Sequence, residues 1–127
     1  MSEEPIYQID VDVSTNFIEE HSSEAENRYV FSYTITIKNT GNQAARLISR
    51  HWIITNADGQ VQEVQGLGVV GEQPHLRPGE AFQYSSGSVL ETPFGTMEGS
   101  YTLIADDKSE FKAPIPPFSL SVPHTLH

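Results

Sequence analysis

Three glycines spaced as Gly66-x-Gly68-x-x-Gly71 form the motif in this sequence that most directly suggests a binding function. In dinucleotide-binding proteins the same spacing lets the backbone approach a pyrophosphate, and a following helix holds the anion at its N-terminus. Here Glu72-Gln73-Pro74 and then Pro78-Gly79 follow the motif, and two prolines so close together prevent a helix of useful length. The motif therefore predicts an irregular loop in which glycine supplies unusual dihedral angles.

Two binding interpretations of this loop stay open. Its backbone N–H groups could form a nest for a small anion such as pyrophosphate, with Arg77 or Arg50 adding positive charge, although the acidic chain disfavours anions. Alternatively, Val69 and Val70 could present an adaptable apolar surface to a protein partner. The candidate binding-loop residues are Gly66, Gly68, Gly71, Glu72 and Arg77.

Acidic and imidazole side chains offer weaker candidates for a metal site. Asp106, Asp107 and Glu110 fall in one predicted connection, where carboxylates could coordinate Mg²⁺, although a charged hairpin turn is the simpler interpretation. The histidines form no His-Glu-x-x-His motif, and a transition-metal site would require several of them to converge. They are His21, His51, His75, His124 and His127, of which His51 is interpreted as structural. No catalytic residue and no cofactor is assigned.

Composition narrows the range of partners. Seventeen acidic residues against seven basic ones give a net charge of −10, which repels nucleic-acid phosphates and anionic membranes. The absence of cysteine excludes a disulfide, an iron–sulfur cluster and a thiol nucleophile. Apolar runs are too short for a transmembrane helix, and the acidic N-terminus lacks the apolar segment of a signal peptide. We therefore expect a cytoplasmic protein.

Alternation of apolar and polar residues is the dominant periodic signal. Between Arg28 and Asn39 every second residue is large and apolar, which predicts a half-buried antiparallel strand. The segment Arg46–Asn56 is apolar on both faces, as in a central strand, with Leu47 and Trp52 assigned to opposite faces. Further strands are predicted at Ile6–Val13, Gln60–Val64 (after an Asp58-Gly59 hairpin turn), Ala81–Ser88, Ser100–Asp106 and Glu110–Val122, whose prolines confine it to an edge or to two pieces.

Seven or eight short strands without a helical segment indicate an all-β fold. We predict a two-layer antiparallel β-sandwich, immunoglobulin-like or fibronectin type III-like and without a disulfide, as a single domain over residues 1–127. Trp52 lies in the third strand, where such domains bury a tryptophan, and should hold the sheets together with Tyr33 and Leu103. The residues preceding Tyr101 resemble a tyrosine corner, in which the phenol bonds to nearby backbone.

Longer stretches of the sequence resemble the ApaG family. The residues that carry the resemblance are Gly66–Pro74, Leu76–Gly87, Thr92–Tyr101, Phe111, Ile115-Pro116, Phe118–Leu120, Ser49–Trp52 and Asn39–Gly41. The resemblance covers essentially the whole chain, and the run from Gly66 to Tyr101 is its most specific part. The length of 127 residues is typical of a stand-alone bacterial member.

The resemblance implies a fibronectin type III-like sandwich without accepted catalytic residues. Bacterial members, also called CorD, are linked to cobalt resistance and magnesium efflux, and related domains of eukaryotic F-box proteins and of a polymerase-delta-interacting protein have an inferred protein-binding role. We therefore expect a non-enzymatic module that binds a protein of unidentified kind. The alternatives are a homeostasis protein that responds to Mg²⁺ or Co²⁺, and a nucleotide or pyrophosphate binder at Gly66–Gly71. Exposed edge strands are also compatible with a homodimer.

Overall fold

The computed structural model describes residues 4–123, and in that range the chain forms eight strands and one short 3-10 helix. The 3-10 helix, η1 (Glu19–His21), connects the first two strands. The strands are β1 (Ile9–Phe17), β2 (Tyr29–Asn39), β3 (Ala45–Asn56), β4 (Val61–Leu67), β5 (His75–Leu76), β6 (Ala81–Leu90), β7 (Phe94–Ala105) and β8 (Glu110–Ser121). Within residues 4–123, no helix has the length and hydropathy needed to cross a membrane.

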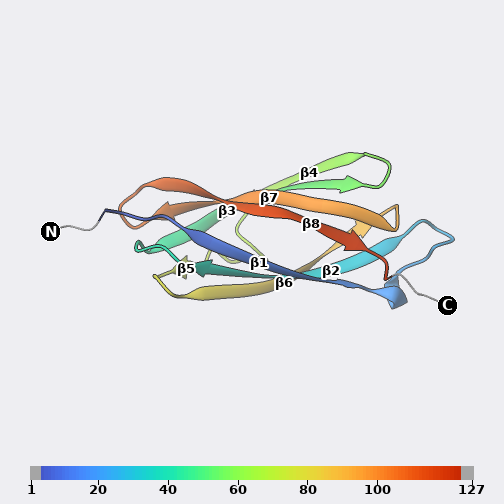
Figure 1. Cartoon of the computed structure of the whole chain (residues 1–127), viewed down its shortest axis with the longest axis horizontal. Coiled ribbons are helices and arrows are strands. Elements are labelled where there is room, and N and C mark those ends of the chain that lie inside the picture. Colours follow the sequence, from blue (N-terminus) through green and yellow to red (C-terminus); the bar gives the residue numbers. More distant parts are fainter. Residues whose placement is uncertain (1–3, 124–127) are drawn as a thin grey trace.

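The strands form two antiparallel sheets that stack face to face (Figure 1). The smaller sheet has the order β1-β2-β6. The larger sheet has the order β4-β3-β7-β8, and β5 pairs with the first residues of β3 on the edge that β4 later occupies. The predicted two-layer antiparallel sandwich of the immunoglobulin or fibronectin type III kind is therefore confirmed, and a chain without cysteine holds it without a disulfide.

Large apolar side chains fill the space between the sheets. The alternating residues of β2 point inward, and Phe31, Tyr33, Ile35 and Ile37 are buried. The ring of Tyr33 lies 5.6 Å from the ring of Trp52 across the interface, measured between centroids. Leu103 is also fully buried, so the predicted role of these side chains in joining the sheets is confirmed.

The prediction that Leu47 and Trp52 point to opposite faces of β3 is wrong. Both side chains are buried in the core. The pairing of β3 with β7 shifts register between Leu47 and Ser49, so that Ile48 is an extra residue in the ladder. A β-bulge of this kind inserts one residue and reverses the alternation that follows it.

The predicted tyrosine corner at Tyr101 is also wrong. Tyr101 lies within β7, which begins at Phe94, earlier than predicted, and its hydroxyl shares a hydrogen bond of 2.5 Å with the hydroxyl of Tyr84 on β6. The bond therefore joins the two sheets instead of fastening a strand to nearby backbone. Burial raises the pKa of Tyr84 to about 12 and raises that of Tyr101 further.

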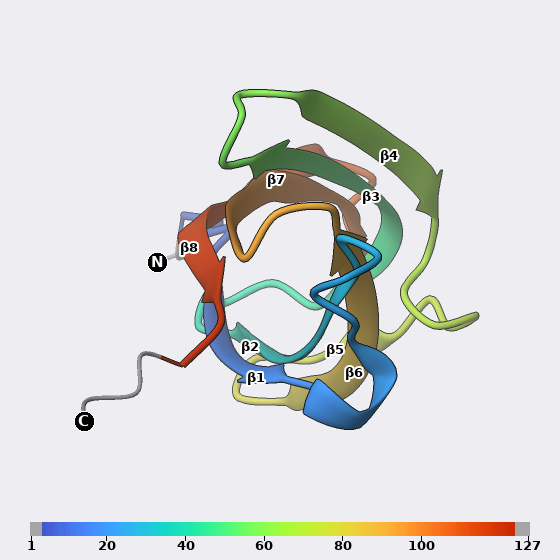
Figure 2. The same cartoon turned by 90° about the vertical axis from the view of Figure 1, so that its right-hand side faces the viewer.

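The two sides of the sandwich differ (Figure 2). On one side β1 and β8 lie next to each other and close the core. β8 is an edge strand, as its prolines predicted, and it is one continuous strand whose register shifts opposite Met97 and Gly99. On the other side β4 and β6 are the last strands of their sheets, and the loop from β4 to β5 projects between them.

Candidate functional site

The glycine motif forms a tight turn between β4 and β5. The N–H of Val69 donates to the carbonyl of Glu72 at 2.8 Å, and the N–H of Glu72 donates back at 2.9 Å. The two residues between them, Val70 and Gly71, have φ angles of 42° and 82°. Positive φ at both central positions defines a type I′ turn, the geometry that suits a two-residue hairpin. The buried side chain of Val69 fixes this turn to the core.

Val70 is the unusual residue of this turn. A β-branched side chain in the left-handed region is a genuine conformational outlier, and the left-handed region costs about 1–2 kcal/mol for residues other than glycine. Type I′ turns favour Asn-Gly at the positions that Val70 and Gly71 hold. The side chain of Val70 is 55% exposed, so burial does not offset the strain. The turn therefore holds an apolar side chain in solvent at the expense of stability.

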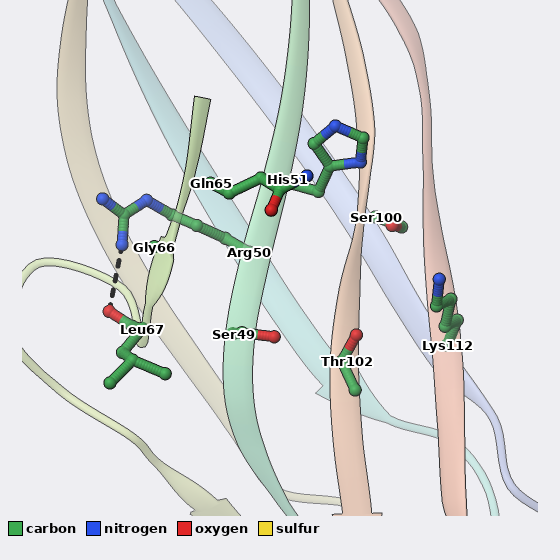
Figure 3. A pocket seen from close by; sticks show the side chains of 9 residues that line it. All are labelled: Ser49, Arg50, His51, Gln65, Gly66, Leu67, Ser100, Thr102 and Lys112. Atoms are coloured by element: carbon green, nitrogen blue, oxygen red, sulfur yellow. Dashed lines mark hydrogen bonds between the residues drawn. The ribbon is translucent and has the colours of Figure 1, made fainter. Parts of the chain in front are cut away.

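Arg50 holds the base of the loop. Its Nη1 donates to the carbonyl oxygens of Leu67 at 3.0 Å and of Gly68 at 2.9 Å. The side chain passes β4 at Gly66, as Figure 3 shows, where a Cβ would lie 2.8 Å from the guanidinium. A Cβ on Gly68, whose φ is 65°, would overlap the carbonyl oxygen of Glu72. The prediction that glycine supplies unusual dihedral angles is confirmed at Gly68 and Gly71, whereas Gly66 lies within β4 and serves close packing against Arg50.

The loop has few backbone donors left for an anion. The N–H groups of Gly68, Val69 and Glu72 already donate to backbone carbonyls. Arg50, a predicted aid to anion binding, is engaged by loop carbonyls. The chain after the motif enters the short strand β5, and no helix follows it within residues 4–123.

The outward face of the larger sheet carries a polar groove of about 410 Å³ beside the loop (Figure 3). Ser49, Thr102 and Lys112 lie in one row across β3, β7 and β8. His51 and Ser100 form the next row. Nε2 of His51 is enclosed, lies 3.8 Å from Oε1 of Glu63 and has no hydrogen-bond partner within the described part of the chain. This groove offers hydroxyl, imidazole and ammonium groups to a polar ligand surface.

Arg77, the remaining predicted binding residue, lies in a separate turn. Its Nε is 3.2 Å from Oε1 of Glu80, which also accepts the backbone N–H of Arg77 at 2.8 Å. The backbone bond and the guanidinium together lower the pKa of Glu80. No hydrogen bond between residues 4 and 123 joins Arg77 to the glycine loop, whereas Glu72 belongs to the loop through its backbone.

The three acidic candidates for a metal site have different partners. Asp106 lies 2.9 Å from Nε2 of His75, Asp107 accepts the hydroxyl of Tyr7, and Glu110 begins β8. The bond from Tyr7 lowers the pKa of Asp107 and raises that of Tyr7. Residues 4–123 contain no group of three or more His, Asp or Glu side chains placed to hold a metal ion. His124 and His127 lie outside the described residues.

Sequence reasoning missed one feature of this region, the exposed outer edge of β4. The strand was predicted at Gln60–Val64 and spans Val61–Leu67, but the sequence did not show that it ends its sheet. Val61 and Leu67, at its two ends, are 62% and 75% exposed. The available signal was a strand with two apolar termini and neither proline nor lysine.

Comparisons with known proteins agree with the fold and cover the loop. The family model of the ApaG domain matches residues 19–105. Curated relatives described as Protein ApaG, from Thiobacillus denitrificans and Aromatoleum aromaticum, are 59% and 58% identical to this chain over its full length and theirs. The crystal structure of an ApaA protein from Bordetella pertussis shares 49% identity and superposes with a TM-score of 0.91, covering 94% of this chain and 97% of that one. The chain belongs to the ApaG domain family.

Proposed function

We propose that this chain is a non-enzymatic binding module that captures a protein partner with the tip of the turn Val69–Glu72. The observation that carries the proposal is the positive φ of the exposed Val70. Backbone strain persists where the surrounding structure imposes it, and it gathers at ligand clamps and binding sites. Here the imposing structure is the buried Val69 before Val70 and, after it, Glu72, which bonds back to Val69 and packs closely against Gly68.

The turn suits a protein surface better than a small molecule. The side chain of Val70 projects from the turn and is exposed, so its complement is a pocket on another macromolecule. Because the loop base is fixed by Arg50, little conformational freedom is lost when the tip is immobilised, and this reduces the cost of binding. Glu72 beside the tip, in a chain with net charge −10, favours a pocket with a basic rim.

The ionisable groups with shifted pKa values support a role other than catalysis. Tyr84 and Tyr101 join the sheets, Tyr7 and Asp107 link the N-terminal segment to a hairpin, and Glu80 closes a turn. Enzymes gather such groups in one cleft. In this protein they are spread over the fold and stabilise it.

The test compares two exposed valines. Val70→Asn removes the apolar tip, and Val89→Asn makes the same change on β6, where the side chain is 50% exposed and φ is not positive. Tagged wild type and both variants are incubated with an extract of the cells that produce the protein, and captured proteins are identified by mass spectrometry. We expect a partner that binds wild type and Val89→Asn and is lost with Val70→Asn. Equal capture by all three proteins contradicts the proposal.

A further inference from the structure

β4 is the last strand of its sheet, and its outer edge carries two exposed apolar side chains, Val61 and Leu67. Two hydrogen bonds at the ends of the β3–β4 pairing show which residues of β4 bond to β3. The N–H of Gly68 donates to the carbonyl of Ile48 at 2.8 Å, and the N–H of Asn56 donates to the carbonyl of Gln60 at 3.0 Å. Because hydrogen-bonded and non-hydrogen-bonded pairs alternate along an antiparallel ladder, the register between these two bonds assigns the bonds with β3 to the even-numbered residues of β4. The backbone groups of Val61, Glu63, Gln65 and Leu67 therefore point away from the sheet. We call these four residues the β4 edge.

The other edge strands are protected against strand addition or lack large apolar side chains at their outward positions. β8 carries Pro114, Pro116 and Pro117, and β1 carries Asp10 and Asp12 and lies against β8. Prolines and charges are the usual devices that prevent strand addition. The outward positions of β6 hold mostly small or polar residues: Ala81, Gln83, Ser85, Gly87 and Val89. The β4 edge instead has an exposed apolar residue at each end. Its own side chains carry one charge, Glu63, and the carbonyl of Leu67 accepts one bond from Arg50 and keeps a second lone pair for an added strand.

We propose that the β4 edge pairs with the β4 edge of a second copy of this chain. The pairing is antiparallel and centred on Val64, so that the two larger sheets become one continuous sheet. Val61 of each copy then lies opposite Leu67 of the other, and Glu63 lies opposite Gln65. Directly opposed side chains are the unit of sheet stabilisation, and this register matches apolar with apolar and acid with amide. An isologous contact of this kind closes a two-fold dimer.

Neighbouring registers are worse by the same criterion. A two-fold axis at Glu63 places two carboxylates opposite each other, and like charges directly opposite destabilise a strand pair. An axis at Gln65 places Glu63 opposite Leu67, and an axis at Gln62 places Val61 opposite Glu63. The centre at Val64 is thus the register in which each apolar end of the edge meets an apolar end.

The net charge of −10 on each copy sets the salt dependence of the pairing. The copies repel one another over distances that salt screens, while the backbone bonds of the β4 edge are short-ranged. The dimer is therefore tighter at higher ionic strength. The proposal is independent of the proposed function, because Val70 lies beyond the paired residues.

Analytical ultracentrifugation of the full chain tests this pairing with two variants that give residue 65 opposite charges. Gln65→Lys places a lysine opposite Glu63 at two symmetric sites, and Gln65→Glu places a carboxylate there. Cross-strand charge pairs of this kind imply a dimer dissociation constant lower by about twofold to thirtyfold for Gln65→Lys and higher by a similar factor for Gln65→Glu. Gln83→Lys and Gln83→Glu on β6 change the net charge equally. In high salt, which screens the repulsion between copies, these two variants should have like dissociation constants.

A cross-linking experiment tests the register itself, because the natural chain has no cysteine. Val61→Cys and Leu67→Cys place a thiol at the two ends of the β4 edge. With a short bis-maleimide, a mixture of the two variants should give a covalent dimer, and each variant alone should not.

Three results would overturn the pairing. They are a wild-type chain that stays monomeric at millimolar concentration in high salt, a dimer that responds to residue 83 instead of residue 65, and self-linking of either cysteine variant alone. None of these results touches the capture of a partner by Val70. Conversely, loss of the Val70 effect leaves the dimer measurements unchanged, so each proposal can fail separately.

Discussion

The guanidinium of Arg50 lies 2.8 Å from the point where a Cβ would stand on Gly66. The glycine makes room for an arginine that starts on the core side of β3 and reaches the carbonyls at the end of β4. The first glycine of a motif associated with phosphate binding therefore serves a cation of the protein's own chain. This contact makes the loop base rigid, and rigidity is what allows the strained tip to persist.

Gly66→Ala should release this contact. The new methyl group displaces the guanidinium, which is the far end of a flexible side chain, and two charge-assisted hydrogen bonds are lost. We expect the free energy of unfolding in urea to fall by about 1–3 kcal/mol, and the loop amides to exchange faster with solvent. Arg50→Ala removes the same bonds, so the double variant should be little worse than Arg50→Ala alone. Fully additive losses would show that the two residues act separately.

Val70→Asn should make the protein more stable. Asparagine tolerates the left-handed region, and Asn-Gly is a favoured pair for a type I′ turn. Relief of the strain at φ 42° should raise the free energy of unfolding by about 1 kcal/mol, equivalent to about 3–5 °C in Tm for a domain of this size. Differential scanning calorimetry measures the change, with Val89→Asn as the control that gains nothing. An unchanged or lower Tm for Val70→Asn would mean that position 70 is not strained.

The hydroxyl pair between the sheets should behave as one unit. Tyr101→Phe leaves the buried hydroxyl of Tyr84 without its partner, and Tyr84→Phe does the same to Tyr101. We expect each single change to cost about 1–3 kcal/mol, because an unpaired buried polar group bears its full desolvation cost. Removing both hydroxyls should cost less than the sum of the single changes. Chemical denaturation of the four proteins completes the cycle, and strict additivity would contradict the shared bond.

The same pair predicts loss of stability at high pH. Burial raises the pKa of Tyr84 from 10.0 to about 12 and raises that of Tyr101 as well. A raised pKa contributes stability that is fully present below the unfolded value near 10 and is lost as pH rises toward the folded value. Phenolate absorbance should therefore show that Tyr84 and Tyr101 stay protonated near pH 11 until the chain unfolds. Ionisation of all five tyrosines near pH 10 in a folded chain would contradict this.

Much of the fold can be predicted from side-chain alternation, because inward and outward residues of a half-buried strand differ in kind. The run from Tyr29 to Ile37 shows this directly. The bulge at Ile48 could not be predicted from this alternation, because a segment that is apolar on both faces does not reveal a one-residue insertion. Tyr101 was misassigned because its partner, Tyr84, lies on another sheet.

Some features of the candidate site could likewise be predicted from the sequence, and others could not. Glycine spacing and the following prolines indicated a loop without a helix, which is a local property of the sequence. The strain at Val70 was not visible, because valine is not a residue that signals a left-handed turn. The role of Arg50 and the exposed position of β4 depend on strand order, which pairs residues from distant parts of the sequence.

We propose that the tip of the turn Val69–Glu72 serves contact with a partner at the expense of stability. The most direct test of this claim is the affinity of the captured partner for Val70→Asn, measured by calorimetry beside wild type and Val89→Asn. We predict that Val70→Asn binds at least about tenfold more weakly, the scale of a buried apolar anchor, although it melts at a higher temperature. Binding by Val70→Asn as tight as that of the wild type would contradict the claim.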